Sequence, residues 1–105
     1  MGSRNRPLSR RARFITFEGG EGGGKTTQAA RLRLALASRG IEAIITREPG
    51  GAPGAEQIRK LLVGGRKDRW DPRAEALLHF AARCEHVAKT IRPALRQGVW
   101  VLCDR

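Results

Sequence analysis

The feature that most constrains this chain is a glycine-rich segment, "GGEGGGKT", which runs from Gly19 to Thr26. It satisfies the pattern G-x-x-x-x-G-K-[ST], in which glycines let backbone N–H groups turn together toward one anion. The pattern needs a strand before it and a helix after it, so that the helix N-terminus faces the phosphates. An apolar run at 13–18 precedes the segment, and a helical pattern at 25–39 follows it. The sequence therefore predicts a loop that binds a nucleoside triphosphate, without specifying the reaction.

This loop assigns roles to individual residues. Lys25 is expected to reach the β- and γ-phosphates, and the Thr26 hydroxyl is expected to bind the Mg²⁺ that arrives with ATP. The candidate phosphate-binding residues are Gly19, Gly20, Glu21, Gly22, Gly23, Gly24, Lys25, Thr26 and Thr27. In the helix that follows, apolar residues recur at helical spacing and a glycine ends the pattern: Ala29, Leu32, Leu36, Ala37 and then Gly40.

Strands and helices alternate along the rest of the chain. We expect strands at 41–46 and 99–104, a loop at 49–54, and helices at 55–63, 73–91 and 93–97, with Pro93 interrupting the long helix. Asp71 and Pro72 are suited to begin that helix. Its predicted buried face comprises Ala76, Leu77, Phe80, Ala81, Cys84 and Val87. The alternation predicts right-handed βαβ crossovers and an α/β fold of the P-loop NTPase type, with three parallel strands and flanking helices.

Composition narrows the class of protein. The 105 residues fit one domain, and the formal charge of +11 suits a protein that handles polyanions such as nucleotides or a nucleic acid. Residues 1–13 carry five arginines and no acid, so we expect a flexible basic tail before a domain at 14–105. Cys84 and Cys103 are expected to be reduced thiols in a cytoplasmic protein. No apolar run approaches the roughly 20 residues that span a bilayer, so no membrane partner is expected.

Four segments together resemble the thymidylate kinase family: "FITFEGGEGGGKTTQ", "TREPGG", "HFAARCEHVAKTIRPAL" and "VWVLCDR". The resemblance runs from about Phe14 to Arg105, and the order of "REPGG", an arginine-bearing helix and a strand ending in "DR" is far more selective than the glycine-rich loop alone. It implies transfer of the γ-phosphate of ATP to dTMP, which gives dTDP for DNA precursor synthesis. ATP and dTMP are then the expected partners, and Mg²⁺ is the expected cofactor.

The residues themselves support part of this chemistry. Transfer between two polyanions requires cationic groups on both sides. Arg47 ends a predicted strand at the carboxyl edge of the sheet, where ligands of parallel sheets bind, and its planar fork suits a phosphate. Asp104 ends another strand there, in the position that holds Mg²⁺ or its water in P-loop proteins. A surface arginine beside a turn, and a carboxylate that only caps a strand, are the alternatives for these two residues.

The resemblance adds further roles. It implies a catalytic set of Lys25, Arg47, Asp104 and Arg105, and a dTMP-binding set of Glu21, Arg47, Glu48, Pro49, His79, Arg83 and Arg105. Thr26 and Asp104 would hold the metal, and the Glu48–Pro49 peptide bond would be cis. Arg83 would bond the thymine base, and His79 stands where the family usually has a stacking phenylalanine. We expect His79 to stack, Phe80 to lie in the core and His86 to be solvated.

The family's kinases are about twice as long and continue with two further strands, an adenine-holding loop and an arginine-bearing lid. Some members carry a catalytic arginine where this chain has Gly22. We therefore expect an N-terminal portion that is inactive by itself and poorly soluble or dimeric, whereas a full-length member would be a homodimer. Three alternatives stay open: another nucleotide kinase, a nucleotide-binding module completed by a partner chain, and a basic nucleic-acid binder. "REPGG" and Arg83 argue against the first alternative. We expect no nucleic acid among the partners.

Overall fold

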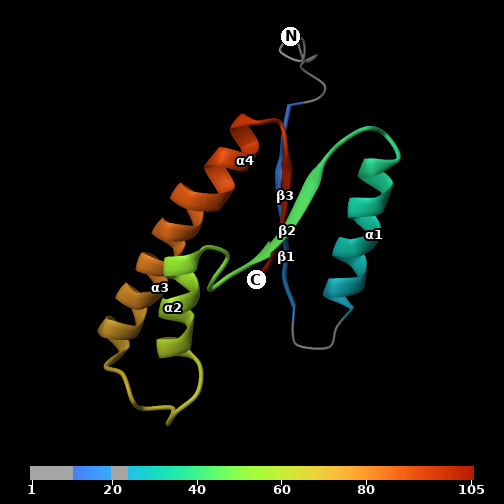
Figure 1. Ribbon diagram of the computed structural model, residues 1–105. Helices are drawn as coiled ribbons and strands as arrows, with labels where there is room; N and C mark the ends of the chain where they lie inside the picture. The colour runs from blue at the N-terminus through green and yellow to red at the C-terminus, as the bar shows by residue number, and fades with distance from the viewer. Residues whose placement is uncertain (1–10, 20–23) are drawn as a thin grey trace.

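The computed structural model describes residues 11–19 and 24–105 (Figure 1). Its elements, in chain order, are β1 (Phe14–Phe17), α1 (Lys25–Ala37), β2 (Ala43–Arg47), α2 (Pro53–Leu62), α3 (Pro72–His86), the π-helical turn η3 (Val87–Ile91), α4 (Arg92–Arg96) and β3 (Trp100–Asp104). Most of the predicted tail, at 1–10, lies outside the described residues, as do Gly20, Glu21, Gly22 and Gly23 of the predicted loop.

The three strands form one parallel sheet in the order β1-β3-β2. Asp104 at the end of β3 is in register with Phe17 of β1 and with Arg47 of β2. The carboxyl ends of all three strands therefore meet at one edge of the sheet. The α/β fold with a parallel sheet and flanking helices, predicted from the alternation of elements, is confirmed.

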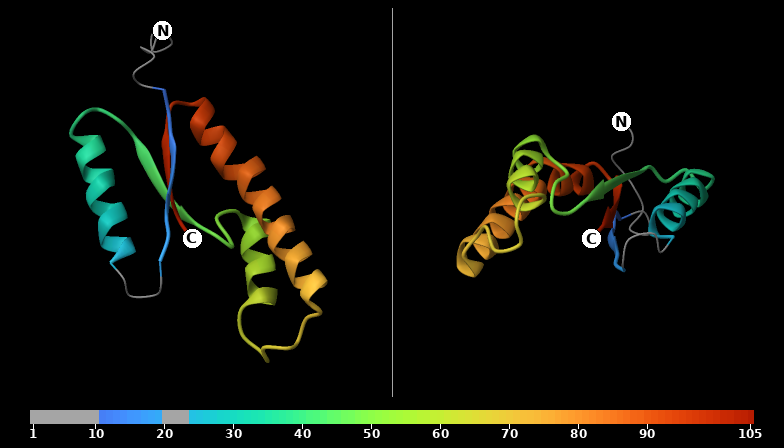
Figure 2. Two further views of the ribbon diagram at one scale, coloured as in Figure 1. Left: turned by 180° about the vertical axis from the view of Figure 1, so that it is seen from behind. Right: turned by 90° about the horizontal axis from the view of Figure 1, so that it is seen from below.

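Strand β3 carries the core on both faces of the sheet. Val101 packs with Ile91 and Ala94 from η3 and α4, whereas Leu102 packs with Leu36 of α1 on the opposite face. Figure 2 shows α1 on one side of the sheet and the α2–α4 segment on the other. Both β3 side chains are fully buried, because neighbouring residues of a strand point to opposite faces and each face here is covered by a helix.

Helices α2 and α3 lie side by side beyond the carboxyl edge of the sheet (Figures 1 and 2). Their contact is built from small side chains, since Ala52, Ala55 and Ala82 form one buried cluster. The predicted buried face is wrong along α3, since Leu77 and Phe80 are 68% and 66% exposed, whereas Val87, its last member, is half-buried against the core around Ile91. The face that packs contains Ala82 and the half-buried Leu78 instead. At the contact itself, the small side chain of Ala82 lets α2 approach closely.

The ends of the helices also differ from the prediction. Pro53 and Gly54, expected in a loop, are the first residues of α2, where a proline is tolerated because the first N–H groups of a helix need no helical partner. Pro93 does not interrupt the long helix, because α4 continues directly from the π-turn η3. π-Helical segments are rare and occur mostly as single turns inside longer helices, as here. Of the apolar residues that recur along α1, Ala29 and Leu36 are buried, whereas Ala37, the last residue, is exposed.

Among the described residues, no helix combines the length and apolar character needed to cross a membrane.

The packing of α3 on α2 through Ala82 leads to a prediction about stability. Ala82 is 1% exposed against α2, whereas its neighbour Ala81 is exposed. Ala82→Leu should overfill the contact and lower the free energy of unfolding by about 1–3 kcal/mol. Ala81→Leu makes the same chemical change at an exposed site and should alter it by less than about 0.5 kcal/mol. Urea denaturation of both variants measures the difference, and equal losses would contradict this packing of α3.

Candidate active site

The side chain of Lys25, at the start of α1, reaches across the carboxyl edge of the sheet to β3. Its Nζ lies 2.7 Å from Oδ1 of Asp104 and donates to the carbonyl oxygen of Arg105 at 3.3 Å. Asp104 Oδ1 is shielded from solvent and, for all its closeness to the ammonium, has no aligned hydrogen-bond donor in the described part of the chain. The arrangement places a phosphate-binding lysine and an oxygen ligand side by side.

Thr26 and Asp104 line the same pocket, which has a volume of about 500 Å³ and also includes Thr46 and Arg47. Mg²⁺ takes hard oxygen ligands, usually one or two from the protein together with phosphate oxygens and waters. The hydroxyl of Thr26 and the carboxylate of Asp104, on one pocket wall, fit such an ion. The residues predicted to hold the metal are therefore brought together.

Arg47 is bound by an acid from α2. Its Nη2 donates to Oε1 of Glu56 at 2.7 Å and its Nε donates to Oε2 at 3.2 Å, while the N–H of Gly51 donates to the same Oε2 at 2.8 Å. The hydrogen bonds from Arg47, followed by that from Gly51, lower the pKa of Glu56 to about 2. Glu56 was not among the predicted site residues. It lies in the first turn of α2, and its pairing with Arg47 is formed across the loop between β2 and α2.

A second pocket, of about 490 Å³, opens between the loop after β2 and the helix α3. Its lining residues are Glu48, Pro49, Ala76, His79, Phe80, Arg83 and Arg105. Five of the seven predicted dTMP-binding residues thus lie around one hollow. Arg47 lines the neighbouring pocket instead, and Glu21 lies outside the described residues. The Glu48–Pro49 peptide bond is cis, as the family resemblance implied.

His79 and Phe80 both line this pocket, and each is exposed. The expectation that Phe80 belongs to the core is therefore wrong, because the packed face of α3 lies around Ala82, on another side of the helix. His79 lies four residues before Arg83, and such residues share a helix face. Either ring is placed where it can contact a flat ligand.

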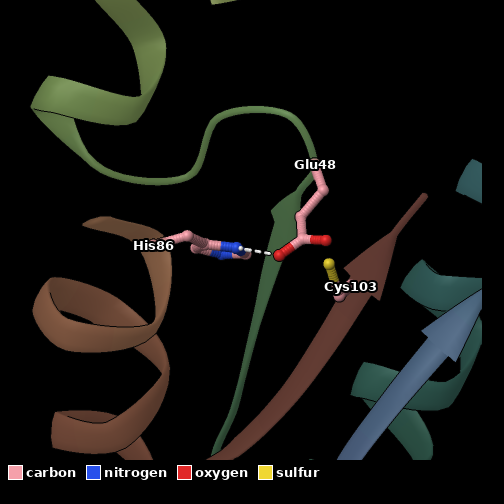
Figure 3. A group of neighbouring side chains, drawn as sticks. All are labelled: Glu48, His86 and Cys103. Carbon is pink, nitrogen blue, oxygen red and sulfur yellow. Dashed lines mark hydrogen bonds and ion pairs between the residues drawn. The ribbon is translucent and has the colours of Figure 1, made fainter. Parts of the chain in front are cut away.

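Glu48 is the most connected acid at this edge. Its Oε1 accepts from Nε and Nη2 of Arg83 at 3.0 and 2.7 Å, and Nε of Arg105 lies 3.7 Å from the same oxygen. Its Oε2 lies 2.9 Å from Nδ1 of His86 (Figure 3). Burial by itself would raise the pKa of Glu48, but the hydrogen bonds from Arg83 and His86 outweigh it and lower the pKa below its ordinary value. The carboxylate is thus held in its ionised form.

His86 is fully buried, so the expectation of a solvated histidine is wrong. Its Nε2 lies 2.8 Å from the hydroxyl of Thr46, and with Nδ1 on Glu48 both ring nitrogens have partners. The charged residues next to it in sequence indicated an exposed histidine. Its spacing of four residues from the buried Ala82, which puts both on one face of α3, is the signal that could have indicated burial. Neither His86 nor Thr46 was among the predicted site residues.

Cys103 completes a group with Glu48 and His86 in which one candidate ligand atom from each side chain lies within 4.8 Å of the others (Figure 3). A metal would require a thiolate, but burial first, and the negative charge of Glu48 next, raise the pKa of Cys103 to about 12. Glu48 is also already engaged by Arg83 and His86. Glu48 and His86 are therefore a hydrogen-bonded pair beside the Cys103 thiol, and the group is poorly suited to a metal ion.

Two further contacts hold the loop that carries Glu48. The hydroxyl of Thr90 in η3 donates to the carbonyl oxygen of Gly51 at 2.6 Å, and Arg59 of α2 donates to that of Pro49 at 2.9 Å. The loop is therefore hydrogen-bonded to both α2 and η3, and these bonds hold the pocket wall that Glu48 and Pro49 form.

This geometry can be compared with known proteins. The family model for thymidylate kinase matches residues 17–105. Thymidylate kinases of Rhizorhabdus wittichii and Caulobacter vibrioides are 63% and 59% identical over 93 and 92 residues, which cover 89% and 88% of this chain. The chain spans 45% and 44% of the length of these two relatives. The crystal structure of thymidylate kinase from Ehrlichia chaffeensis superposes with a TM-score of 0.77 at 42% identity, over 90% of this chain and 54% of that one. The chain belongs to the thymidylate kinase family.

Proposed function

We propose that residues 14–105 form part of a kinase domain that transfers the γ-phosphate of ATP to dTMP, giving dTDP. The observation that carries the proposal is the pocket lined by Glu48, Pro49, His79, Arg83 and Arg105, which lies at the same sheet edge as the Lys25–Asp104 pair. One polyanion can then bind on the Lys25 side and a second on the Arg83 side. A reaction that joins two phosphorylated substrates needs this arrangement.

On the donor side, Lys25 is proposed to contact the β- and γ-phosphates, and Thr26 and Asp104 to hold Mg²⁺, which would offset charge on the phosphate oxygens. The short Lys25–Asp104 distance of 2.7 Å supports this assignment, because it puts the ammonium and the metal ligand within reach of one phosphate group. The N-terminus of α1 points its N–H groups to the same place.

On the acceptor side, Arg83 is proposed to hydrogen-bond the base, with His79 or Phe80 against its face. Arg105 and Arg47 are proposed to bind the acceptor phosphate from two directions. Arg47 is half-exposed and paired with Glu56, so a phosphate dianion would share its guanidinium with Glu56 or displace the carboxylate. The protein is proposed to act in the cytoplasm, where its substrates ATP and dTMP are present and where Cys84 and Cys103 stay reduced. Homodimerisation and the inactivity of these 105 residues by themselves stay predictions, and ADP release in the presence of dTMP tests the second.

The acceptor side is tested by removing Arg83. Arg83→Ala should weaken dTMP binding at least tenfold, because a charge-assisted hydrogen bond to a ligand contributes about 1.5–3 kcal/mol. Arg96→Ala removes the same charge from an exposed position on α4 and should change the affinity less than twofold. Calorimetric titration of both variants with dTMP gives the two affinities, and an unchanged affinity in Arg83→Ala would contradict the assignment.

The donor side separates a nucleotide kinase from a basic nucleic-acid binder. Lys25→Ala should abolish measurable binding of a fluorescent ATP analogue with Mg²⁺, because the ammonium faces the phosphates. Arg33→Ala, at an exposed position in the middle of α1, is the matched control and should bind as the unsubstituted chain does. A salt-sensitive shift with an oligonucleotide that Lys25→Ala leaves unaltered, together with no ATP binding by the unsubstituted chain, would favour the nucleic-acid binder.

The Arg47–Glu56 pair predicts a pH dependence of stability. The pKa of Glu56 in the folded chain is about 2, below its ordinary value of 4.5. Its contribution to stability is therefore complete above pH 4.5 and is lost as the pH falls from 4.5 toward 2. The difference in the free energy of unfolding between the unsubstituted chain and Glu56→Gln should shrink over that range. Glu42→Gln, at an exposed site, controls for the loss of a carboxylate. A difference that stays constant with pH would contradict the pairing.

A further inference from the structure

The starting point is a fully buried histidine that ends α3. The ring of His86 lies between the end of β2 and the loop after it, with Nδ1 on Glu48 and Nε2 on Thr46 (Figure 3). It does not line the acceptor pocket. A polar side chain with no exposed surface and two directed hydrogen bonds has a defined orientation, since breaking either bond leaves a buried group unpaired.

The direction of these hydrogen bonds follows from the charge on Glu48. Its pKa is lowered, so the carboxylate is ionised and can only accept. Nδ1 of His86 must therefore carry the proton and donate to Oε2. In the neutral ring Nε2 is then the acceptor, and the hydroxyl of Thr46 donates to it. The chain of donors thus runs from Thr46 through the imidazole to the carboxylate.

Glu48 in turn orients two arginines that line the pocket, Arg83 and Arg105. Its side chain is 9% exposed, while those of Arg83 and Arg105 are 52% and 36% exposed. One carboxylate oxygen is taken by His86, so the other is directed at the two guanidinium groups. Arg83 uses Nε and Nη2 for Glu48, and its remaining N–H groups stay available at the pocket.

The imidazole is also held from the loop side. A Cβ placed on Gly51, whose φ is +91°, would lie 2.3 Å from Cδ2 and Nε2 of His86 and 2.5 Å from Oγ1 of Thr46. The backbone of Gly51 therefore packs directly on the His86–Thr46 hydrogen bond. Since Thr90 also holds the carbonyl oxygen of Gly51, the ring cannot turn without moving the loop.

We propose that His86 is a positioning residue that acts through Glu48: it fixes the carboxylate, and the carboxylate fixes the guanidinium groups of Arg83 and Arg105 at the acceptor pocket. The arrangement of the arginines stands on contacts within the chain itself. The effect of this arrangement on the affinity for a nucleoside monophosphate rests on the proposed function.

Two amide substitutions separate the two ring nitrogens. The amide nitrogen of asparagine lies near the place of Nδ1, and that of glutamine lies near the place of Nε2. His86→Asn should therefore keep a donor for Glu48 and lose the bond to Thr46. His86→Gln should keep a partner for Thr46 and lose the donor for Glu48. Both variants remove the ring, and asparagine is the smaller side chain, so a loss that came only from packing would be at least as large in His86→Asn as in His86→Gln.

The first measurement needs no ligand. In a ¹H–¹⁵N spectrum, the Nε–H of Arg83 should give a slowly exchanging signal because it is bonded to Glu48. The signal should persist in His86→Asn and be lost in His86→Gln, with circular dichroism confirming that both variants are folded. Equal behaviour of the two folded variants would overturn the proposal. In the unsubstituted chain, long-range ¹H–¹⁵N correlations should place the proton of His86 on Nδ1, and a proton on Nε2 alone would overturn it even if both variants failed to fold.

The second measurement is dTMP affinity by calorimetry. We expect His86→Gln to bind dTMP about tenfold more weakly and His86→Asn to bind within about threefold of the unsubstituted chain. Equal weakening in both would show a structural role only and overturn the proposal. If the unsubstituted chain binds no dTMP, the proposed function fails, whereas the Arg83 signal still decides whether His86 positions the arginines.

Discussion

Strand β3 lies between β1 and β2, and the parallel pairing on both of its sides determines where every candidate site residue can be. Asp104 is in register with Phe17 on one side and Arg47 on the other, so the segments that follow the three strands begin at the same level. The complete burial of Val101, Leu102 and Cys103 anchors this register, because a one-residue shift would turn each side chain to the opposite face. The site is a consequence of that register.

Basic side chains at this edge are paired with acids. Lys25 lies 2.7 Å from Asp104, Arg47 is bonded twice to Glu56, and Arg83 is bonded twice to Glu48. The pairs hold long, flexible side chains in one orientation, which lowers the entropy lost when a ligand binds. An arginine with two of its N–H groups on a carboxylate still presents others to a phosphate or a base. The acids therefore orient the cations without removing them from the pockets.

Much of this architecture follows from local sequence. Glycines, β-branched runs and the Asp71–Pro72 pair predict the order and type of the elements, and the spacing of "GGEGGGKT", "REPGG" and "DR" predicts which strand ends carry the site. Side-chain partners do not follow in the same way. Glu56 and Glu48 find their arginines across 9 and 35 residues of sequence. His86 looked solvated because its neighbours in sequence are charged, whereas burial depends on the neighbours that the tertiary fold supplies.

The register of α3 shows why one helix can carry both packing and ligand contacts. Ala82 faces α2, and Arg83, one residue and about 100° further around the helix, faces the pocket together with His79. His86, four residues after Ala82, returns to the packed side at the level of the loop after β2, where it meets Glu48. The larger apolar residues Leu77 and Phe80 could not take the place of Ala82 without pushing α2 away, and α2 carries Glu56 and Arg59. The small side chain of Ala82 thus determines how closely α2 approaches α3, and with it where Glu56 and Arg59 lie.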